Sequence, residues 1–186
     1  MIILRRSNLF KRLLRVARND TSKVEVRLKI NMKAIKNKIN NKNIKLAIVV
    51  SRFNDFISKR LLAGCLNELK KNGVSEKSII ILWVPGVFEI PVTALKFAKS
   101  KNIQAIICLG AVIRGETFHF ELVAESAARG ILEVSLQTQK PVIFGVLSTD
   151  TVDQAYKRSE EKGDNKGKDA ALAALEMINV LSSIKA

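Results

Sequence analysis

Four short apolar runs, separated by longer segments, constrain the fold of this 186-residue chain more than any other feature. The runs are rich in Val and Ile and lie at 45–50, 78–84, 104–110 and 141–148. A continuous β-branched run of this length is typical of a strand that is buried on both faces. After the first and third runs, apolar residues recur about every fourth position, as on one face of a helix. This alternation predicts an α/β domain, a three-layer α/β/α sandwich around a mostly parallel four-stranded sheet.

The ends of the predicted helices are marked by capping residues. Asn54 or Asp55 is expected to begin the first helix, and Gly73 is expected to end it. Pro91 suits the first turn of the second helix, which is predicted to reach about Lys101. The remaining helices are predicted at 119–138, at 149–162 with Thr149 or Asp150 as the cap, and at 168–183 after the interruption "GDNKG".

Most of the positive charge of the chain lies near its N-terminus. The formal net charge is +15, but residues 1–42 hold 13 of the 32 Lys and Arg residues and 2 of the 17 acidic residues. The rest of the chain has no basic stripe interleaved with aromatic residues, as a nucleic-acid surface would need. We therefore predict two regions, a basic extension over 1–42 and a globular domain over 43–186, and we expect nucleic-acid binding only from the extension.

The basic extension begins with "MIILRRSNLFKRLLRVARND", for which three interpretations stay open. An Arg-rich, acid-poor segment is typical of a transit peptide that is removed in an organelle. It is also typical of a basic arm that binds RNA or an anionic surface. The third interpretation, a disordered stretch or one that precedes a true start at Met32, is the one we expect. It predicts a cytoplasmic protein, with an organelle as the alternative.

Two classes of protein are excluded by composition. The chain has no run of 18 uninterrupted apolar residues, so we expect no membrane span. It has one histidine and two cysteines, Cys65 and Cys108, which are far apart in apolar surroundings. This spacing predicts neither a disulfide framework nor a metal site, and it favours buried free thiols in a reducing compartment.

The residues that follow the predicted strands carry the candidate chemistry. In an open parallel sheet, ligands bind beyond the carboxyl ends of the strands. These positions hold "SRFND", "PGVFEIP", "GAVIRGETFHF" and "STDT". They include the aromatic rings of Phe53 and Phe88, the carboxylate of Glu89, a glycine-bearing turn and the single histidine, His119. Such a set would suit a planar heterocycle stacked on a ring, a polyol held by Glu89 and a phosphate on the turn. His119 would then transfer protons near neutral pH.

Each of these residues also has a structural interpretation. Phe53 and Phe88 could pack against the edge of the domain. Glu89 could cap the helix that begins near Pro91. Arg114 could pair with a neighbouring acid, and "RGET" is not a Walker motif. The expected convergence of all of them on one edge of one sheet favours the functional interpretation.

The strand-end motifs together resemble the lumazine synthase family, over residues 44 to about 183. The motifs "SRFND", "VPGVFEIP", "LGAVIRGETFHFELV", "PVIFGVLSTD" and "GDNKGKDAALAALEM" occur in the order and spacing of the family. The resemblance implies a flavodoxin-like catalytic domain and a transferase of riboflavin biosynthesis. Such an enzyme condenses 5-amino-6-(D-ribitylamino)uracil with 3,4-dihydroxy-2-butanone 4-phosphate and gives 6,7-dimethyl-8-ribityllumazine. The family uses neither a metal nor an organic cofactor.

The resemblance also implies a role for individual residues. His119 matches the proton-transfer histidine of the family, and Phe53 should stack on the pyrimidine. Arg158 matches the phosphate-binding arginine. The other implied substrate contacts are Val87, Phe88 and Glu89 for the ribityl chain, Ala111, Val112 and Ile113 for the pyrimidine, Glu116 and Thr117 for the phosphate, Phe144 from a neighbouring subunit, and Lys166 near the pyrimidine. Ala111 stands where many relatives have threonine, a difference of little weight for a contact made by the backbone.

The family also implies an assembly of identical subunits. Its active sites lie between the subunits of a homopentamer, and some members pack twelve pentamers into an icosahedral shell of sixty subunits. The short connection "EEKGDNKGKD" favours the shell. Two other functions stay open, an RNA-binding protein that uses its basic extension and a related archaeal riboflavin synthase. The intact "RGETFHF" favours lumazine synthase over the second.

Overall fold

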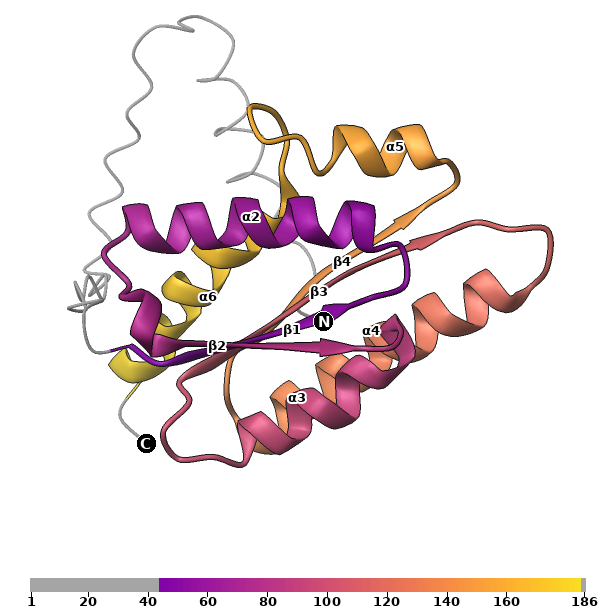
Figure 1. The fold of residues 1–186 in the computed structure, drawn as a ribbon. Helices are drawn as coiled ribbons and strands as arrows, with labels where there is room; N and C mark the ends of the chain where they lie inside the picture. The colour runs from indigo at the N-terminus through magenta and orange to yellow at the C-terminus, as the bar shows by residue number, and fades with distance from the viewer. Residues whose placement is uncertain (1–43, 185–186) are drawn as a thin grey trace, which may run out of the picture. The chain divides into compact units, whose positions relative to one another are not determined.

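The computed structural model describes residues 44–184, which form a four-stranded parallel sheet between two layers of helices (Figure 1). The strands are β1 (Leu46–Ser51), β2 (Ile79–Val84), β3 (Ala105–Ile113) and β4 (Val142–Thr149). Their order across the sheet is β2-β1-β3-β4, and every neighbouring pair is parallel. The predicted α/β class and the flavodoxin-like arrangement are confirmed, because this order reverses direction between β1 and β3.

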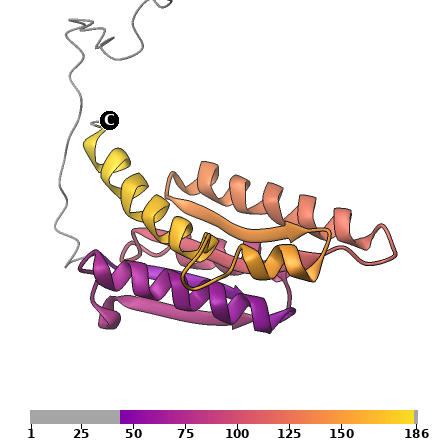
Figure 2. The same cartoon turned by 90° about the horizontal axis from the view of Figure 1, so that it is seen from above.

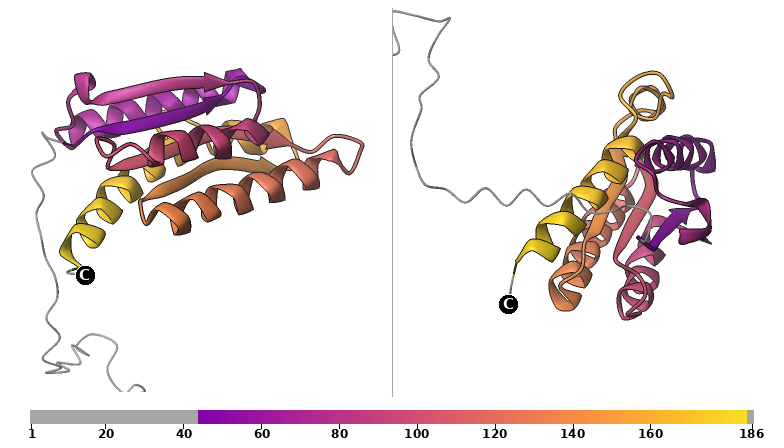
Figure 3. Two further views of the ribbon diagram at one scale, coloured as in Figure 1. Left: turned by 90° about the horizontal axis from the view of Figure 1, so that it is seen from below. Right: turned by 90° about the vertical axis from the view of Figure 1, so that its left-hand side faces the viewer.

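The helices divide between the two faces of the sheet. One face is covered by α2 (Asp55–Lys71), α5 (Val152–Lys157) and α6 (Lys166–Ser183), which are nearest the viewer in Figure 2. The other face is covered by α3 (Ile90–Ala98) and α4 (His119–Thr138), as the view from below in Figure 3 shows. Two short 3₁₀ turns, Glu76–Ser78 and Val87–Glu89, precede β2 and α3.

The central strand β1 contributes to both halves of the core. Successive side chains of a strand point to opposite faces. Ile48 and Val50 therefore pack among residues of α2 and α6, whereas Ala47 and Val49 pack among residues of α3 and α4. All six residues of β1 are buried, as its β-branched run predicts.

Strand β2 differs from the prediction for residues 78–84, which was a strand buried on both faces. It lies at the edge of the sheet, and its three central residues, Ile80, Ile81 and Leu82, are exposed. The prediction of burial on both faces was therefore wrong. The same apolar run occurs in a central strand and in an edge strand whose side chains are exposed in the single subunit.

Several predicted helix ends were also wrong. Asn54 stands at the start of α2 with a φ of 59°, but its side chain does not cap the helix, and its Nδ2 donates to Ala111 O at 3.0 Å. Thr151, and not Thr149 or Asp150, caps α5, and its oxygen accepts from Gln154 N. Helix α3 ends at Ala98, α5 ends at Lys157, and α6 begins earlier than predicted, at Lys166.

The C-terminal end of α2 is as predicted. Gly73 has a φ of 83°, which a residue with a Cβ rarely adopts. Its N–H donates to Lys70 O at 3.0 Å, and the next N–H, of Val74, donates to Leu69 O at 3.1 Å. This pair of hydrogen bonds is the Schellman motif that ends many helices.

The basic extension lies outside the described residues, so its three interpretations and the boundary near residue 43 stay predictions. Between residues 44 and 184, no helix combines the length and the apolar character needed to cross a membrane.

Candidate active site

A hollow of about 760 Å³ lies beyond the carboxyl ends of β1, β2 and β3, where the strand order reverses. We call it the strand-end hollow. Its walls are the loops that leave these strands and the first turns of α4. The predicted site residues that line it are Phe53, Val87, Phe88, Glu89, Ala111, Val112, Ile113, Thr117 and His119.

Two aromatic rings of the strand-end hollow are turned towards solvent. Phe53 is 71% exposed and Phe88 is 61% exposed, so the interpretation that they pack against the domain edge is wrong. The loop that carries Phe53 is nevertheless held in place, because Phe53 N donates to Pro85 O at 3.0 Å. An exposed ring on a fixed backbone offers a flat apolar face to a planar ligand.

Glu89 braces its own loop. Its Oε2 accepts a hydrogen bond from Gly86 N at 2.8 Å, in the manner of a capping box. The interpretation that Glu89 caps the helix that begins near Pro91 is therefore wrong, because its side chain makes no cap bond to α3 and instead caps the 3₁₀ turn Val87–Glu89. Within the described residues, its other oxygen makes no hydrogen bond or ion pair. Glu89 therefore fixes its loop through one carboxylate oxygen, and its other oxygen is able to accept a hydrogen bond from a ligand.

The end of β3 presents backbone groups to the strand-end hollow. Strand β3 pairs with β1 only as far as Leu109, but it pairs with β4 as far as Ile113. On the β1 side, the polar groups of residues 110–113 are therefore not part of a ladder, and Asn54 Nδ2 bonds one of them, Ala111 O. Backbone N–H and C=O groups in this position can recognise the edge of a heterocycle.

Arg114 anchors the loop between β3 and α4. Its Nε lies 2.7 Å from Asp150 Oδ1, its NH1 contacts Glu121 Oε1, and its guanidinium carbon lies 4.3 Å from the centre of the Phe120 ring. The hydrogen bond from Arg114 lowers the pKa of Glu121, and the bonds to Asp150 and Glu121 raise the pKa of Arg114. The structural interpretation of Arg114, that it pairs with neighbouring acids, is the correct one.

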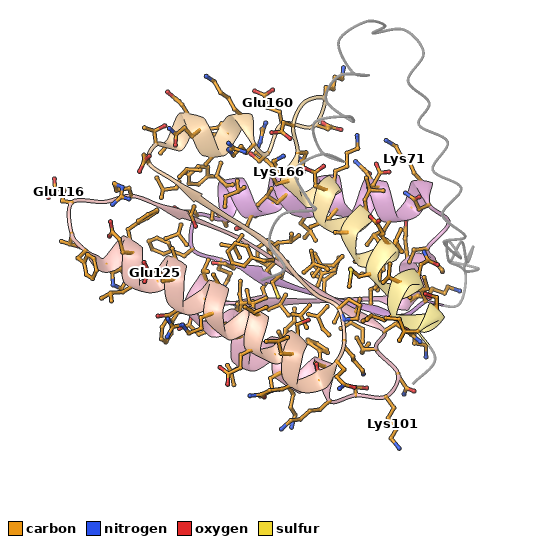
Figure 4. The ribbon with its side chains drawn as sticks, turned by 180° about the vertical axis from the view of Figure 1, so that it is seen from behind. Lys71, Lys101, Glu116, Glu125, Glu160 and Lys166 are labelled. Carbon is orange, nitrogen blue, oxygen red and sulfur yellow. The ribbon has the colours of Figure 1, made fainter. Side chains whose placement is uncertain are left out.

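The anchored loop leads directly into the first turn of α4. His119 is the first residue of this helix, and it is exposed at the rim of the strand-end hollow together with Thr117. The free backbone N–H groups at a helix start favour an anion. Glu116 is not among the lining residues, and Figure 4 shows it at the outer tip of the loop.

A second hollow, of about 600 Å³, lies along β4 between α5 and α6. We call it the β4 hollow. It contains the remaining predicted site residues, Phe144, Arg158 and Lys166. One protomer therefore separates its candidate residues into two groups. His119 and Phe53 lie together, whereas Arg158 lies in a different hollow.

The two cations of the β4 hollow share a carboxylate. Lys166 Nζ lies 2.7 Å from Asp164 Oδ1 and 2.9 Å from Asp169 Oδ2, and these hydrogen bonds raise its pKa. Arg158 NH1 lies 4.0 Å from the other oxygen of Asp164. A phosphate bound here would make the same charge-assisted contacts that Asp164 makes in this structure.

Some residues that line the two hollows or lie beside them were not predicted. Leu122 and Phe120 line the strand-end hollow from the start of α4, and Asp169 lines the β4 hollow. Asn165 caps α6 with its side-chain oxygen. For Asn165 the sequence did contain a signal, since asparagine is one of the residue types preferred at a helix cap and an Ala-rich helical segment follows it after four residues.

Neither cysteine belongs to a candidate site. Both are buried, and burial raises the pKa of the Cys65 thiol to about 12 and raises that of Cys108 as well. Among residues 44–184, no group of three or more His, Cys, Asp and Glu side chains is placed to hold a metal ion.

Residues 43–182 match the family model described as 6,7-dimethyl-8-ribityllumazine synthase.

Proposed function

The chain belongs to the 6,7-dimethyl-8-ribityllumazine synthase family, a family of transferases in riboflavin biosynthesis, and we propose that its strand-end hollow and the β4 hollow of a neighbouring subunit form one catalytic site. The reaction condenses 5-amino-6-(D-ribitylamino)uracil with 3,4-dihydroxy-2-butanone 4-phosphate. The observation that carries the proposal is the division of the candidate residues, since His119 and Arg158 line different hollows of the same protomer.

The strand-end hollow suits the pyrimidine substrate. In our proposal the ring stacks on Phe53, whose face is exposed. The backbone of Ala111–Ile113 contacts its polar edge from the side that faces away from β4, because this stretch of β3 pairs with β4 but not with β1. The ribityl chain lies beside Val87 and Phe88, with its hydroxyls donating to the unpaired oxygen of Glu89.

The phosphate of the second substrate needs donors from both hollows. Thr117 and the N–H groups at the start of α4 supply one side, and the loop with Glu116 lies next to them. Arg158 of the neighbouring subunit supplies the positive charge, and Lys166 and Phe144 approach with it from the β4 hollow. A guanidinium can bind a phosphate through two parallel hydrogen bonds, which fixes its orientation.

The chemistry then follows from this placement. The 5-amino group attacks the ketone, and the carbinolamine loses water to give an imine. Phosphate leaves by elimination, and ring closure releases a second water. His119 moves protons during these steps, an effect typically worth about 10²–10⁴-fold in rate. Arg158 stabilises the departing phosphate, and the orientation of two bound substrates supplies much of the remaining acceleration.

An exposed apolar face on α4 supports an assembly of subunits. Phe118, Leu122, Leu132 and Leu136 are each more than half exposed, and they recur at intervals that place them along one side of the helix. The exposed charged residues Glu125 and Arg129 lie on the same side, between the two apolar pairs. Exposed apolar patches that are bordered by polar residues mark interaction sites. We propose a homopentamer, and the short connection at 160–169 favours a shell of twelve pentamers. Light scattering on the chain from Met1 and on the chain from Met32 tests the subunit count.

Steady-state kinetics on two variants test the assignment of residues. We expect His119→Ala to lower kcat by about 10²–10⁴-fold with little change in KM. We expect Arg158→Ala to raise the KM for the butanone phosphate. Lys157→Ala is the matched control, since it removes one positive charge from the neighbouring position. Product formation is followed by the absorbance and fluorescence of the lumazine. An unchanged KM in Arg158→Ala would remove the phosphate role of this residue.

A further inference from the structure

We propose that Asn165 is a positioning residue that fixes Arg158 and Lys166 relative to each other in the β4 hollow. The inference rests on the proposed function, because it assumes that these two cations bind substrate. Asn165 does not line the hollow, so it would act only through the backbone that carries the cations.

The Asn165 side chain is buried, with 3% of its surface exposed, and every polar atom of its carboxamide is used. Its Oδ1 accepts from Gly167 N at 2.9 Å and from Lys168 N at 3.3 Å. Its Nδ2 donates to Ser159 O at 2.9 Å and to Arg60 O at 3.2 Å. A buried polar group that is fully bonded in this way specifies one arrangement of the segments around it.

The four bonds connect three segments. The acceptor oxygen holds the first turn of α6, where Lys166 begins the helix (Figure 4). One donor bond holds Ser159, the residue directly after Arg158. The loop is closed next to this bond, because Lys166 N donates to Arg158 O at 2.9 Å. The backbones of the two cationic residues are therefore tied together beside the Asn165 carboxamide.

Helix α2 provides the fixed base for this arrangement. The second donor bond of Asn165 reaches Arg60 O of α2, and Arg60 Nε donates to Ser159 Oγ at 3.3 Å. The carboxamide also occupies the space that a side chain at Gly64 would need. A Cβ on Gly64 would lie 2.3 Å from Asn165 Oδ1, so the close approach of α2 depends on this glycine.

A helix cap alone would not need the two donor bonds. Aspartate caps helices about as well as asparagine does, because only the side-chain oxygen is required. Asn165→Asp therefore keeps the acceptor for Gly167 N and Lys168 N and removes both donors. It also places a carboxylate oxygen against two carbonyl oxygens, so the residues after Arg158 must move away.

The test measures the KM for the butanone phosphate and inhibition by inorganic phosphate on the assembled full-length protein. We expect Asn165→Asp to raise both the KM and the inhibition constant by about tenfold, since misplacing a binding group by about 1 Å costs up to about 100-fold. The KM for the pyrimidine should change much less. In the double variant Asn165→Asp with Arg158→Ala, the KM should exceed that of Arg158→Ala alone by much less than the factor that Asn165→Asp causes in the wild type, because only the effect through Lys166 is left once Arg158 is gone.

A second variant keeps the test decisive if Asn165→Asp does not fold. Gly64→Ala leaves all four bonding groups in place but pushes on Asn165 Oδ1, and alanine is otherwise the better helix former. Gly64→Ala should therefore also raise the KM for the butanone phosphate. The control is Val134→Ala, a buried residue of α4 on the opposite face of the sheet, which should lower the melting temperature without changing this KM.

Three results would overturn the inference, and they can be distinguished from one another. If Asn165→Asp and Gly64→Ala keep the wild-type KM while Arg158→Ala raises it, the proposed function stands and Asn165 is a structural cap only. If Arg158→Ala itself leaves the KM unchanged, the phosphate role of Arg158 fails, and the inference about Asn165 fails with it. Additive effects in the double variant would likewise contradict an action through Arg158.

Discussion

The contact between α2 and α6 should not tolerate a side chain at Gly167. A Cβ at this position would lie 1.9 Å from Leu61 O and 2.6 Å from Leu61 C. Both atoms belong to the backbone of α2, so no side-chain rotation can relieve the overlap. Since ordinary contact begins at 3.4 Å, Gly167→Ala must separate the two helices by about 1.5 Å or distort the first turn of α6.

The expected loss of stability follows from two opposing terms. Overpacking a core typically costs about 1–3 kcal/mol, and a backbone neighbour places this site near the upper limit. The higher helix propensity of alanine offsets up to about 1 kcal/mol. The net loss is therefore about 2 kcal/mol, which corresponds to about 4–8 °C in Tm for a chain of this size.

The assay is thermal unfolding followed by circular dichroism, at one protomer concentration because assembly raises Tm. Gly115→Ala is the matched control, since a Cβ on Gly115 would meet no atom within 4 Å. This control should melt within about 1–2 °C of the wild type, as surface substitutions generally do. If Gly167→Ala melts like Gly115→Ala, the close approach of α2 and α6 is refuted.

Two further predictions concern titrating groups. With a pKa of about 12, only about 1 in 10⁴ Cys65 thiols is ionised at about pH 8, so neither Cys65 nor Cys108 should react with a thiol reagent until the protein is unfolded in guanidinium. Fast labelling of either cysteine in the native protein would contradict its burial. Arg114 lowers the pKa of Glu121 in the folded state, so their pairing should stabilise the protein above the unfolded pKa near 4.5, and this stabilisation should be lost as the pH falls through the lowered value. Urea unfolding of Arg114→Met should therefore show a deficit at about pH 7 that shrinks at lower pH and at high salt, and a deficit that is equal at every pH would contradict the electrostatic role.

The order of strands and helices could be predicted because each strand is a compact β-branched run. The burial of the second run could not, because an apolar run does not reveal whether its strand is central or at an edge. The order of the strands decides whether the second run is buried, and in this sheet β2 is an edge strand next to β1. The sequence signal for helix caps was also incomplete. Asn54 has the residue type of a cap, but a long-range bond to Ala111 O competes successfully for its side chain.

The strand-end hollow could be predicted in outline, since loops that follow parallel strands meet at one edge of the sheet. Phe53, Glu89 and His119 lie there as expected. The separation of Arg158 and Lys166 from His119 could not be seen in the motifs. It follows from β4 being the other edge strand, so that the loop after it opens along that edge and not beside β1.

Mixed assemblies test most directly whether two subunits share one site. His119→Ala and Arg158→Ala subunits are produced together in equal amounts. The activity of the mixed assemblies is compared with that of each variant alone, at a butanone phosphate concentration far below the raised KM of Arg158→Ala, where each variant alone is nearly inactive. In a ring in which each site takes one hollow from each of two neighbours, about a quarter of randomly formed sites would contain both native residues, so we predict about 25% of the wild-type activity. Activity no greater than the average of the two variants would show that one subunit supplies both residues, and it would contradict the shared site.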